Sequence, residues 1–242
     1  MKKGYDVFGP AYGVMLRNDL HALESIDHKF MREMILLEEE SYDFLYHAAP
    51  VRINMEAHEL YSFAKRFKGN DDRQTMEHIL RYTAKIASDY QTAFEDMKFG
   101  GTEKEILERG TDWCADMARV GAVLLQCNGI PARIVHLVNL EKAYNGHVVT
   151  EAFYEGKYGV CDFLYGYSFY NKRPLDAYDL TRCKRYLEGY PEEYASLYST
   201  AAINEYDPMG DNDYTVSLPN QYTIRIIETE HNGKWFMGED KD

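Results

Sequence analysis

No stretch of the 242-residue sequence approaches the run of about 20 apolar residues that a membrane-spanning helix needs. Lys2 and Lys3 follow Met1, but no apolar segment comes after them, so the start of the sequence lacks the pattern of a signal peptide. The residues are 45% apolar and 28% charged, a composition typical of soluble globular proteins. The sequence therefore predicts a soluble, cytoplasmic protein with no membrane partner.

Positive charge is scarce as well. The 27 lysine and arginine residues are outnumbered by 40 aspartate and glutamate residues, and the formal net charge is −13. The acidic residues are distributed along the chain, for example at Glu38-Glu39-Glu40 and Glu192-Glu193, and do not form one block. Because the phosphate backbone of a nucleic acid repels such a chain, we expect no nucleic-acid partner.

Patterns typical of metal sites are also missing. The four cysteines show no C-x-x-C spacing and no adjacent histidine, which argues against a structural zinc site. The acidic segment Asp207–Asp213 lacks the residue spacing of a calcium loop and is interpreted as a solvated turn. We therefore predict no metal and no cofactor. This cysteine usage fits a reducing cytoplasm.

The length is sufficient for one domain with a substantial core, and we predict a single domain over residues 1–242. Its N-terminal part, residues 1–99, is predicted to be helical. Apolar residues recur at three- and four-residue steps from Val14 to Ala49, which is typical of helices. Further helices are predicted from Met55 to Phe67 and from Asp71 or Asp72 to about Phe94.

The central part, residues 100–165, contains the residues that suggest chemistry. Thr102-Glu-Lys-Glu105 is a capping-box pattern for a short helix. Gly110-Thr-Asp-Trp-Cys114 then opens a second helix, with Thr111 or Asp112 as N-cap, that ends at Asn128-Gly129. This helix has few polar residues and should be buried. Cys114 lies in its first turn, where the positive helix end favours the nucleophilic thiolate form.

The pattern after Pro131 changes from helical to strand-like. Ala132–Leu140, His147–Tyr154 and Lys157–Phe163 are rich in β-branched and aromatic residues, and Glu155-Gly156 is a hairpin-like turn. We predict three consecutive antiparallel strands. Helices followed by such a meander indicate an α+β fold in which the buried Cys114 helix packs on an antiparallel sheet.

The remaining residues, 166–242, are predicted to be a tyrosine-rich elaboration. Short helices are predicted at Leu175–Leu187 and Glu192–Ala202, and a hairpin is predicted from Tyr222 to Phe236. Simple packing is the favoured interpretation of each individual tyrosine, although together they are candidates to line a substrate cleft. These tyrosines are Tyr165, Tyr167, Tyr170, Tyr178, Tyr186, Tyr190, Tyr194 and Tyr198.

A cysteine nucleophile needs a base within hydrogen-bond reach and a third group that orients the base. His147 opens the second predicted strand and Asp162 ends the third, so the hairpin turn places them nearly opposite each other. His136 is the competing base, but no carboxylate is positioned to pair with it, and we interpret it as a packed core residue. The other cysteines, Cys127, Cys161 and Cys183, are interpreted as inert buried residues.

Several motifs in this region resemble the transglutaminase-like superfamily. They are Gly110-Thr-Asp-Trp-Cys114, Cys127-Asn-Gly-Ile-Pro-Ala-Arg133, Gly146-His147 with Thr150-Glu-Ala-Phe-Tyr154, and Gly156-Lys-Tyr-Gly-Val-Cys-Asp162. The resemblance covers about residues 100–165. It implies a papain-like fold and a triad of Cys114 as nucleophile, His147 as base and Asp162 as orienting carboxylate. Two positions depart from the family pattern: Tyr158 stands where tryptophan is common, and Trp113 stands where many members have a small residue.

The function predicted from this resemblance is acyl transfer on a peptide or protein amide through a thioester on Cys114. Water is the expected acceptor, because a crosslinking enzyme must admit an amine while excluding water from the thioester. The leading prediction is therefore a peptidase or amidase. The alternatives are a non-catalytic binding or scaffolding module of the same fold, a protein-glutamine transglutaminase and a glycanase-type amidase. The sequence leaves the substrate and the oligomeric state open.

Overall fold

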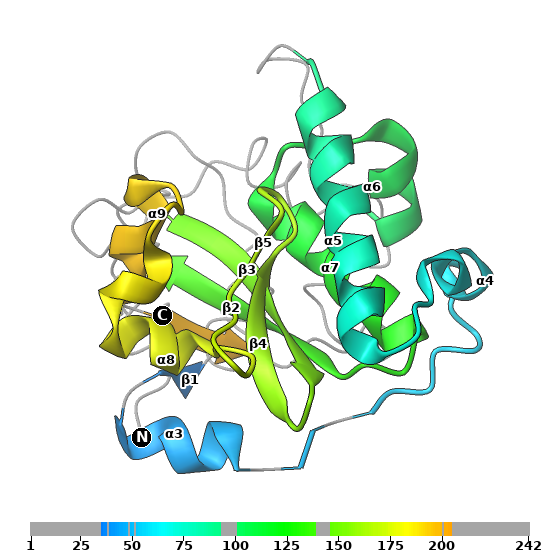
Figure 1. The fold of residues 1–242 in the computed structure, drawn as a ribbon. Helices are drawn as coiled ribbons and strands as arrows, with labels where there is room; N and C mark the ends of the chain where they lie inside the picture. Colours follow the sequence, from blue (N-terminus) through cyan, green and yellow to red (C-terminus); the bar gives the residue numbers. More distant parts are fainter. Residues whose placement is uncertain are drawn as a thin grey trace, which may run out of the picture.

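The computed structural model describes residues 35–37, 39–47, 49–50, 52–92, 101–138, 146–199 and 201–204 (Figure 1). The helix predicted before residue 35 and the hairpin predicted at Tyr222–Phe236 lie outside these residues. The described helices are α3 (Glu39–Tyr46), α4 (Tyr61–Ala64), η1 (Lys65–Phe67), α5 (Asp72–Asp89), α6 (Glu103–Arg109), α7 (Cys114–Cys127), α8 (Ala177–Arg182), η3 (Lys184–Leu187), α9 (Glu192–Ala195) and η4 (Ser196–Ser199). The described strands are β1 (Ile35–Leu36), β2 (Ala132–Val138), β3 (Gly146–Tyr154), β4 (Lys157–Asp162), β5 (Tyr167–Ser168) and β6 (Ala201–Asn204).

The described strands form one six-stranded sheet in the order β1-β6-β2-β3-β4-β5, and every neighbouring pair is antiparallel. Strands β2, β3 and β4 are the predicted meander. Glu155 and Gly156 have φ angles of 52° and 78°, and Tyr154 pairs with Lys157 across them. Two consecutive positive φ angles give a tight turn whose twist suits a hairpin. The predicted α+β class and the meander are confirmed.

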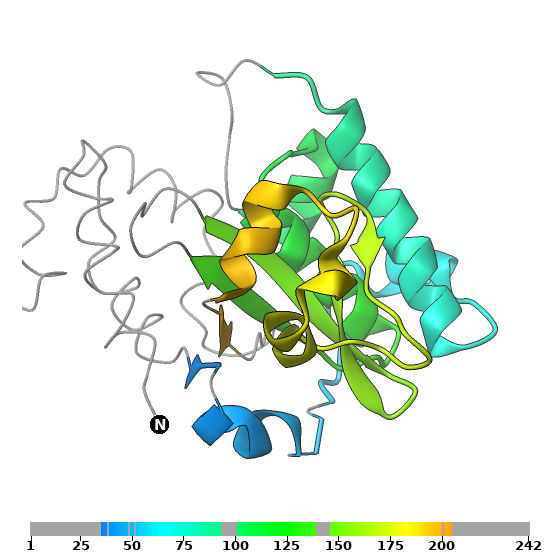
Figure 2. The same cartoon turned by 60° about the vertical axis from the view of Figure 1, so that its left-hand side comes forward.

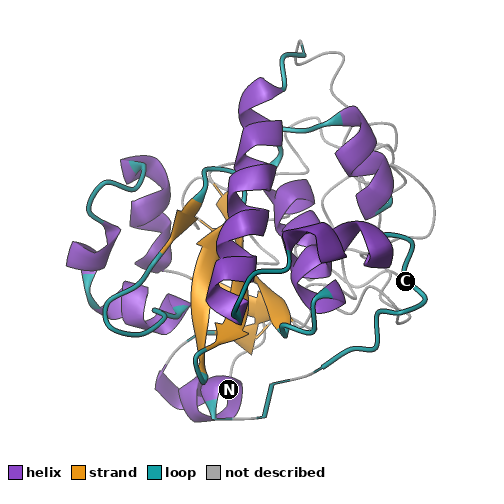
Figure 3. Ribbon diagram, turned by 45° about the vertical axis from the view of Figure 1, so that its right-hand side comes forward, coloured by secondary structure: helices purple, strands orange, loops and turns teal. Residues whose placement is uncertain are grey.

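Helix α7 packs on one face of this sheet, with α5 beside it (Figures 1 and 3). Gly121 lets the end of β4 come close, since a Cβ atom there would lie 2.1 Å from the Phe163 ring. Thr150 of β3 donates a hydrogen bond of 2.9 Å to the Ala118 carbonyl oxygen. These contacts fix the start of α7, where Cys114 lies, relative to the strands that carry His147 and Asp162.

The tyrosine-rich segment forms a layer on the other side of the sheet. Helices α8 and α9 lie there in Figure 2, and apolar residues of this layer share a core cluster with Val149 of β3 and Val160 of β4. Leu180 and Leu197 are among the buried members of that cluster. The segment that the sequence presented as an elaboration is therefore an integral part of the packing around the strands.

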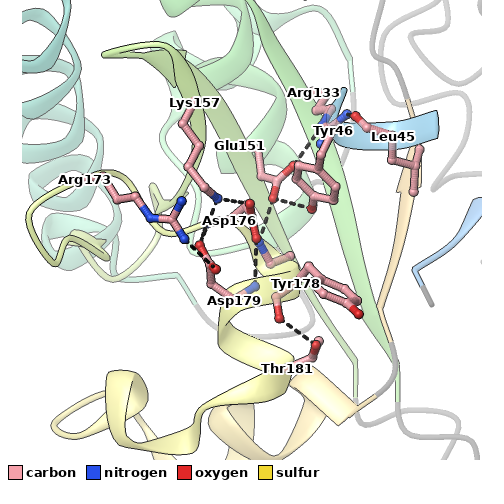
Figure 4. A network of polar contacts seen from close by, with 11 residues as sticks. Leu45, Tyr46, Arg133, Glu151, Lys157, Arg173, Asp176, Tyr178, Asp179 and Thr181 are labelled. Carbon is pink, nitrogen blue, oxygen red and sulfur yellow. Dashed lines mark hydrogen bonds and ion pairs between the residues drawn. The ribbon is translucent and has the colours of Figure 1, made fainter. Parts of the chain in front are cut away.

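The buried carboxylate of Glu151 joins this layer to the sheet (Figure 4). Glu151 of β3 accepts a hydrogen bond of 2.8 Å from the Arg133 Nε of β2. The other carboxylate oxygen of Glu151 accepts bonds from the Tyr46 hydroxyl at 2.8 Å and the Ala177 amide at 2.7 Å. One carboxylate thus connects β3 to β2, α3 and the start of α8.

Two predicted helices are wrong where they overlap the sheet. Residues 35–36, predicted to be helical, form β1, and residues 201–202, predicted to end the helix from Glu192, form part of β6. β6 pairs with both β1 and β2. Short apolar runs fit either a strand or a helix. Here the strand is favoured because the edge of β2 supplies backbone hydrogen-bond partners for β6. Strand β5 was not predicted.

Local polar contacts explain two further differences. The helix predicted from Met55 begins only at Tyr61, because side chains before it bond to nearby amides. Asn54 accepts from the Glu56 amide at 3.0 Å, and His58 Nδ1 accepts from the Leu60 amide at 3.1 Å. At α7 the N-cap residue is Trp113, not Thr111 or Asp112.

Other local predictions are confirmed. Asp71 caps α5 by accepting from the Gln74 amide at 2.7 Å, and Thr102 and Glu105 form the predicted capping box of α6. Within the described parts of the chain, no helix has the length and apolar character needed to cross a membrane.

Candidate active site

His147 and Asp162 meet where β3 begins and β4 ends. Extending the hairpin register one step beyond the Thr150–Cys161 pair puts Asp162 opposite Val149, two residues along β3 from His147. Side chains two residues apart on a strand leave the same face of the sheet. Accordingly, the His147 Nε2 atom lies 2.8 Å from Asp162 Oδ2, and both side chains are buried.

Four donors surround the Asp162 carboxylate. Oδ1 accepts hydrogen bonds from the backbone amides of Leu164 at 2.9 Å and Tyr165 at 3.1 Å. Oδ2 accepts from the Tyr190 hydroxyl at 2.5 Å in addition to its contact with His147. A carboxylate that is 0% exposed needs such partners, because water cannot reach it. The orientation of Asp162 is therefore fixed.

Cys114 is the first residue of α7, is partly exposed, and lies close enough to His147 to help raise the pKa of the imidazole. Since Nε2 is engaged by Asp162, Nδ1 is the ring nitrogen left for the sulfur. Burial acts to lower the pKa of His147, but its hydrogen bond to Asp162 and its interaction with Cys114 outweigh burial and raise that pKa to about 9. The imidazole is thus cationic at neutral pH, between a carboxylate and a sulfur.

Aromatic side chains from the tyrosine-rich layer cover the imidazole. The Tyr194 ring stacks on His147 with centroids 4.3 Å apart, and the Tyr165 ring lies 5.8 Å from it. The Tyr165 hydroxyl donates to the Tyr194 hydroxyl at 3.1 Å. Trp113 and Tyr165 remain 43% and 41% exposed, so aromatic surface is open to solvent beside Cys114.

Tyr190 and Tyr194 contact Asp162 and His147, whereas the sequence named them only within a group of eight tyrosines that were candidates to line a cleft. The density of tyrosines in this region was the available signal, and it did not distinguish the residues beside His147 from those in the core. Their contacts depend on how the segment after β5 folds back over the start of β3.

His136, the competing base, is buried in the sheet between Val148 of β3 and Ala202 of β6. Burial lowers its pKa to about 3. An imidazole that stays neutral is unsuited to form an ion pair with a thiolate. In the described residues, no group of three or more histidine, cysteine, aspartate or glutamate side chains is arranged to hold a metal ion.

We expect iodoacetamide to alkylate Cys114 faster than the other cysteines at neutral pH, because the residue is partly exposed and lies beside a cationic imidazole. Cys127 and Cys161 are buried, and burial raises the pKa of Cys127 to about 11 and that of Cys161 further. Cys183, which the sequence predicted to be buried, is partly exposed like Cys114 and is the matched comparison. Peptide mapping after short labelling measures the rates. Equal labelling of Cys183 and Cys114 would contradict the assignment of Cys114 as the reactive thiol.

Comparison with known proteins agrees with the motifs. A sequence model of the transglutaminase-like superfamily matches residues 61–163, which run from α4 to the end of β4 and include Cys114, His147 and Asp162. A crystal structure of a candidate cysteine protease from Cytophaga hutchinsonii is 19% identical with a TM-score of 0.36, over 53% of this chain and 43% of that one. Curated proteins gave no match. The match of residues 61–163 to the transglutaminase-like superfamily agrees with the resemblance of the sequence motifs.

Proposed function

We propose that this protein is a cysteine-dependent hydrolase of peptide or protein amides, with Cys114 as nucleophile, His147 as acid and base, and Asp162 as the group that orients His147. The observation that carries the proposal is the contact chain from Cys114 through His147 to Asp162, in which a raised pKa keeps the imidazole cationic. A cysteine beside a histidine with a shifted pKa, which is in turn oriented by a third group, is typical of sites for nucleophilic catalysis.

In the acylation step the Cys114 thiolate attacks the carbonyl carbon of the amide. The negative charge that develops on the carbonyl oxygen lies near the amide of Cys114 at the positive end of α7. The His147 imidazolium donates its Nδ1 proton to the amide nitrogen, the carbon–nitrogen bond breaks, and the amine leaves. The products are a thioester on Cys114 and a neutral imidazole.

Deacylation uses the same groups in reverse order. The neutral imidazole takes a proton from a water molecule as that water attacks the thioester carbonyl carbon. The carbon–sulfur bond then breaks, which releases the carboxylic acid product and restores the thiolate and the imidazolium. Asp162 keeps the Nε2 proton in place throughout, so that Nδ1 is the atom that exchanges protons with the substrate.

Water is the proposed acceptor because the nucleophile is open to solvent. Cys114 is partly exposed, and the neighbouring Trp113 and Tyr165 side chains are themselves well exposed. An enzyme that transfers the acyl group to an amine must keep water away from the thioester, which requires a closed aromatic wall.

The test is incubation of the protein with a peptide library, with and without a primary amine, followed by mass spectrometry. Cys114→Ala is the blank, because it removes the sulfur while leaving the rest of the site in place. Cysteine-dependent cleavage or deamidation supports the proposal. Cysteine-dependent incorporation of the amine as the main product would replace hydrolysis by transglutamination. A non-catalytic binding module would show no cysteine-dependent product together with a Cys114 that is no more reactive than Cys183.

The raised pKa of His147 predicts an alkaline limit for hydrolysis. Turnover should fall as the pH rises through about 9, because His147 then loses the proton that the leaving amine needs. Alkylation of Cys114 by iodoacetamide uses no such proton and should not fall over the same range. Parallel pH profiles of turnover and alkylation check this, and a fall in turnover centred near pH 7 would disagree.

The same proton is linked to folding stability. The folded protein binds it more tightly than the unfolded chain does, where a histidine has a pKa near 6.5. This contribution to stability is therefore complete below about pH 6.5 and is lost as the pH rises through about 9.

A further inference from the structure

Tyr190 reaches the candidate site from outside the family core of residues 61–163. It lies in the turn between η3 and α9, and its hydroxyl donates a hydrogen bond of 2.5 Å to Asp162 Oδ2. The side chain is buried, with 6% of its surface exposed. A short bond between a neutral hydroxyl and an ionised carboxylate in a buried place is among the stronger hydrogen bonds of proteins.

Of the four donors around Asp162, Tyr190 is the one that shares an oxygen with His147. The amides of Leu164 and Tyr165 bind Oδ1, whereas the hydroxyl of Tyr190 and the Nε2 proton of His147 both address Oδ2. Two donors on one oxygen draw on the same negative charge. A stronger bond from Tyr190 therefore weakens the hold of Asp162 on the imidazolium, and a weaker one strengthens it.

The Tyr190 ring is held on several sides, so its hydroxyl has little freedom to leave Oδ2. It makes edge-on contacts with Tyr167, Phe169 and Tyr198, with centroids 5.2, 5.3 and 6.3 Å away. The backbone amide of Tyr190 also donates to the Leu187 carbonyl at 3.1 Å. These contacts place the phenol independently of Asp162.

We infer that Tyr190 is a positioning residue that fixes the Asp162 carboxylate and sets the strength of its hydrogen bond to His147. The inference concerns the role of Tyr190 in the reaction and so rests on the proposed function, but the hydrogen-bond coupling itself needs no substrate. Under this inference Tyr190, a residue of the tyrosine-rich layer, acts together with the catalytic residues proposed in the transglutaminase-like core.

Several ionisable groups face the imidazole and must be considered in a titration. They are Cys114 from α7, Asp162 from β4, Tyr165 from the turn after β4, and Tyr194 from α9 with Glu193 against its hydroxyl. Burial raises the pKa values of Tyr165, Tyr190 and Tyr194, so these phenols stay neutral while His147 titrates. A change at Tyr190 therefore reaches His147 through the hydrogen bond to Asp162 and not through a new charge.

The experiment compares Tyr190→Phe with Tyr198→Phe in the full chain. Tyr198 is a matched control, because it is a buried neighbour in the same cluster whose hydroxyl bonds to none of the described residues. The titration of the His147 ring is followed by NMR. We expect its midpoint to move upward by about half a pH unit or more in Tyr190→Phe. It should stay at the wild-type value in Tyr198→Phe. An unchanged or lower midpoint in Tyr190→Phe would overturn the inference.

A second variant keeps the shape of the side chain. Replacing Tyr190 by 3-fluorotyrosine makes the phenol a stronger donor, so the His147 midpoint should move downward, opposite to the change in Tyr190→Phe. If the His147 midpoint moves in the same direction in both variants, altered packing is the cause and the hydrogen-bond role is rejected. This readout requires no turnover. If the coupling is observed and no amide is cleaved, the proposed function fails while the Asp162–Tyr190 coupling stands.

An assay with a substrate distinguishes a positioning role of Tyr190 from a direct contact with the substrate. Tyr190→Phe should reduce kcat with little change in KM and shift the alkaline limit upward, because the phenol acts through Asp162 and His147 and does not contact the substrate. Loss confined to KM would indicate a substrate contact and contradict the positioning role.

Discussion

Asp162→Asn is expected to reduce kcat for an amide substrate by about three to four orders of magnitude while the protein stays folded. The reason lies in the donors around the carboxylate. An asparagine has one carbonyl oxygen and one amino group, whereas both oxygens of Asp162 accept two hydrogen bonds each. Keeping the carbonyl oxygen on the amides of Leu164 and Tyr165 turns the amino group toward His147 Nε2.

The Nε2 atom must then accept a hydrogen bond, so the remaining proton of a neutral imidazole moves to Nδ1. That tautomer cannot take a proton from Cys114 or from water, and the imidazolium also loses its counter-charge. We expect the pKa of His147 to fall below its present value of about 9 in this variant.

Single-turnover and steady-state assays with a peptide identified in the library experiment measure the effect. Asp176→Asn is the control, because Asp176 is also a buried aspartate, and asparagine preserves its role as the N-cap of α8. Turnover of Asp162→Asn within about tenfold of wild type would show that Asp162 does not orient the base.

Glu151→Ala is expected to lower the free energy of unfolding by about 3–5 kcal/mol. The change would leave Arg133, a residue that is 3% exposed, without its counter-charge. It would also remove the acceptor of the Tyr46 hydroxyl and of the first amide of α8 (Figure 4). Arg133 keeps its contact with the Leu45 carbonyl oxygen and its place over the Tyr158 ring, but neither group carries a compensating charge.

Chemical denaturation of wild type, Glu151→Ala and Glu108→Ala tests this. Glu108 is exposed on α6, so its replacement should change the unfolding free energy by less than about 0.5 kcal/mol. The double variant Arg133→Met with Glu151→Leu removes both charges and should recover much of the loss. A loss below about 1 kcal/mol in Glu151→Ala would show that water or another group compensates Arg133.

The sequence by itself determined the features that depend on neighbouring residues. The capping box of α6 and the stop of α7 at Asn128-Gly129 depend on residues within a few positions of each helix end. The hairpin turn at Glu155-Gly156 then fixed the pairing of β3 with β4, and with it the approach of His147 to Asp162. For this reason the three proposed catalytic residues were available from the chain alone.

Only the tertiary structure decided which tyrosines surround those residues and which short segments complete the sheet. Tyr190 meets Asp162 across 28 residues, and Tyr46 meets Glu151 across 105. Residues 201–204 become a strand because they pair with β2, and residues 35–36 become a strand because they pair with residues 201–204. Such contacts leave no periodic pattern in the sequence. The identity and spacing of side chains indicate only the structure within a few residues of a position, whereas distant partners are determined by the packing of the whole chain.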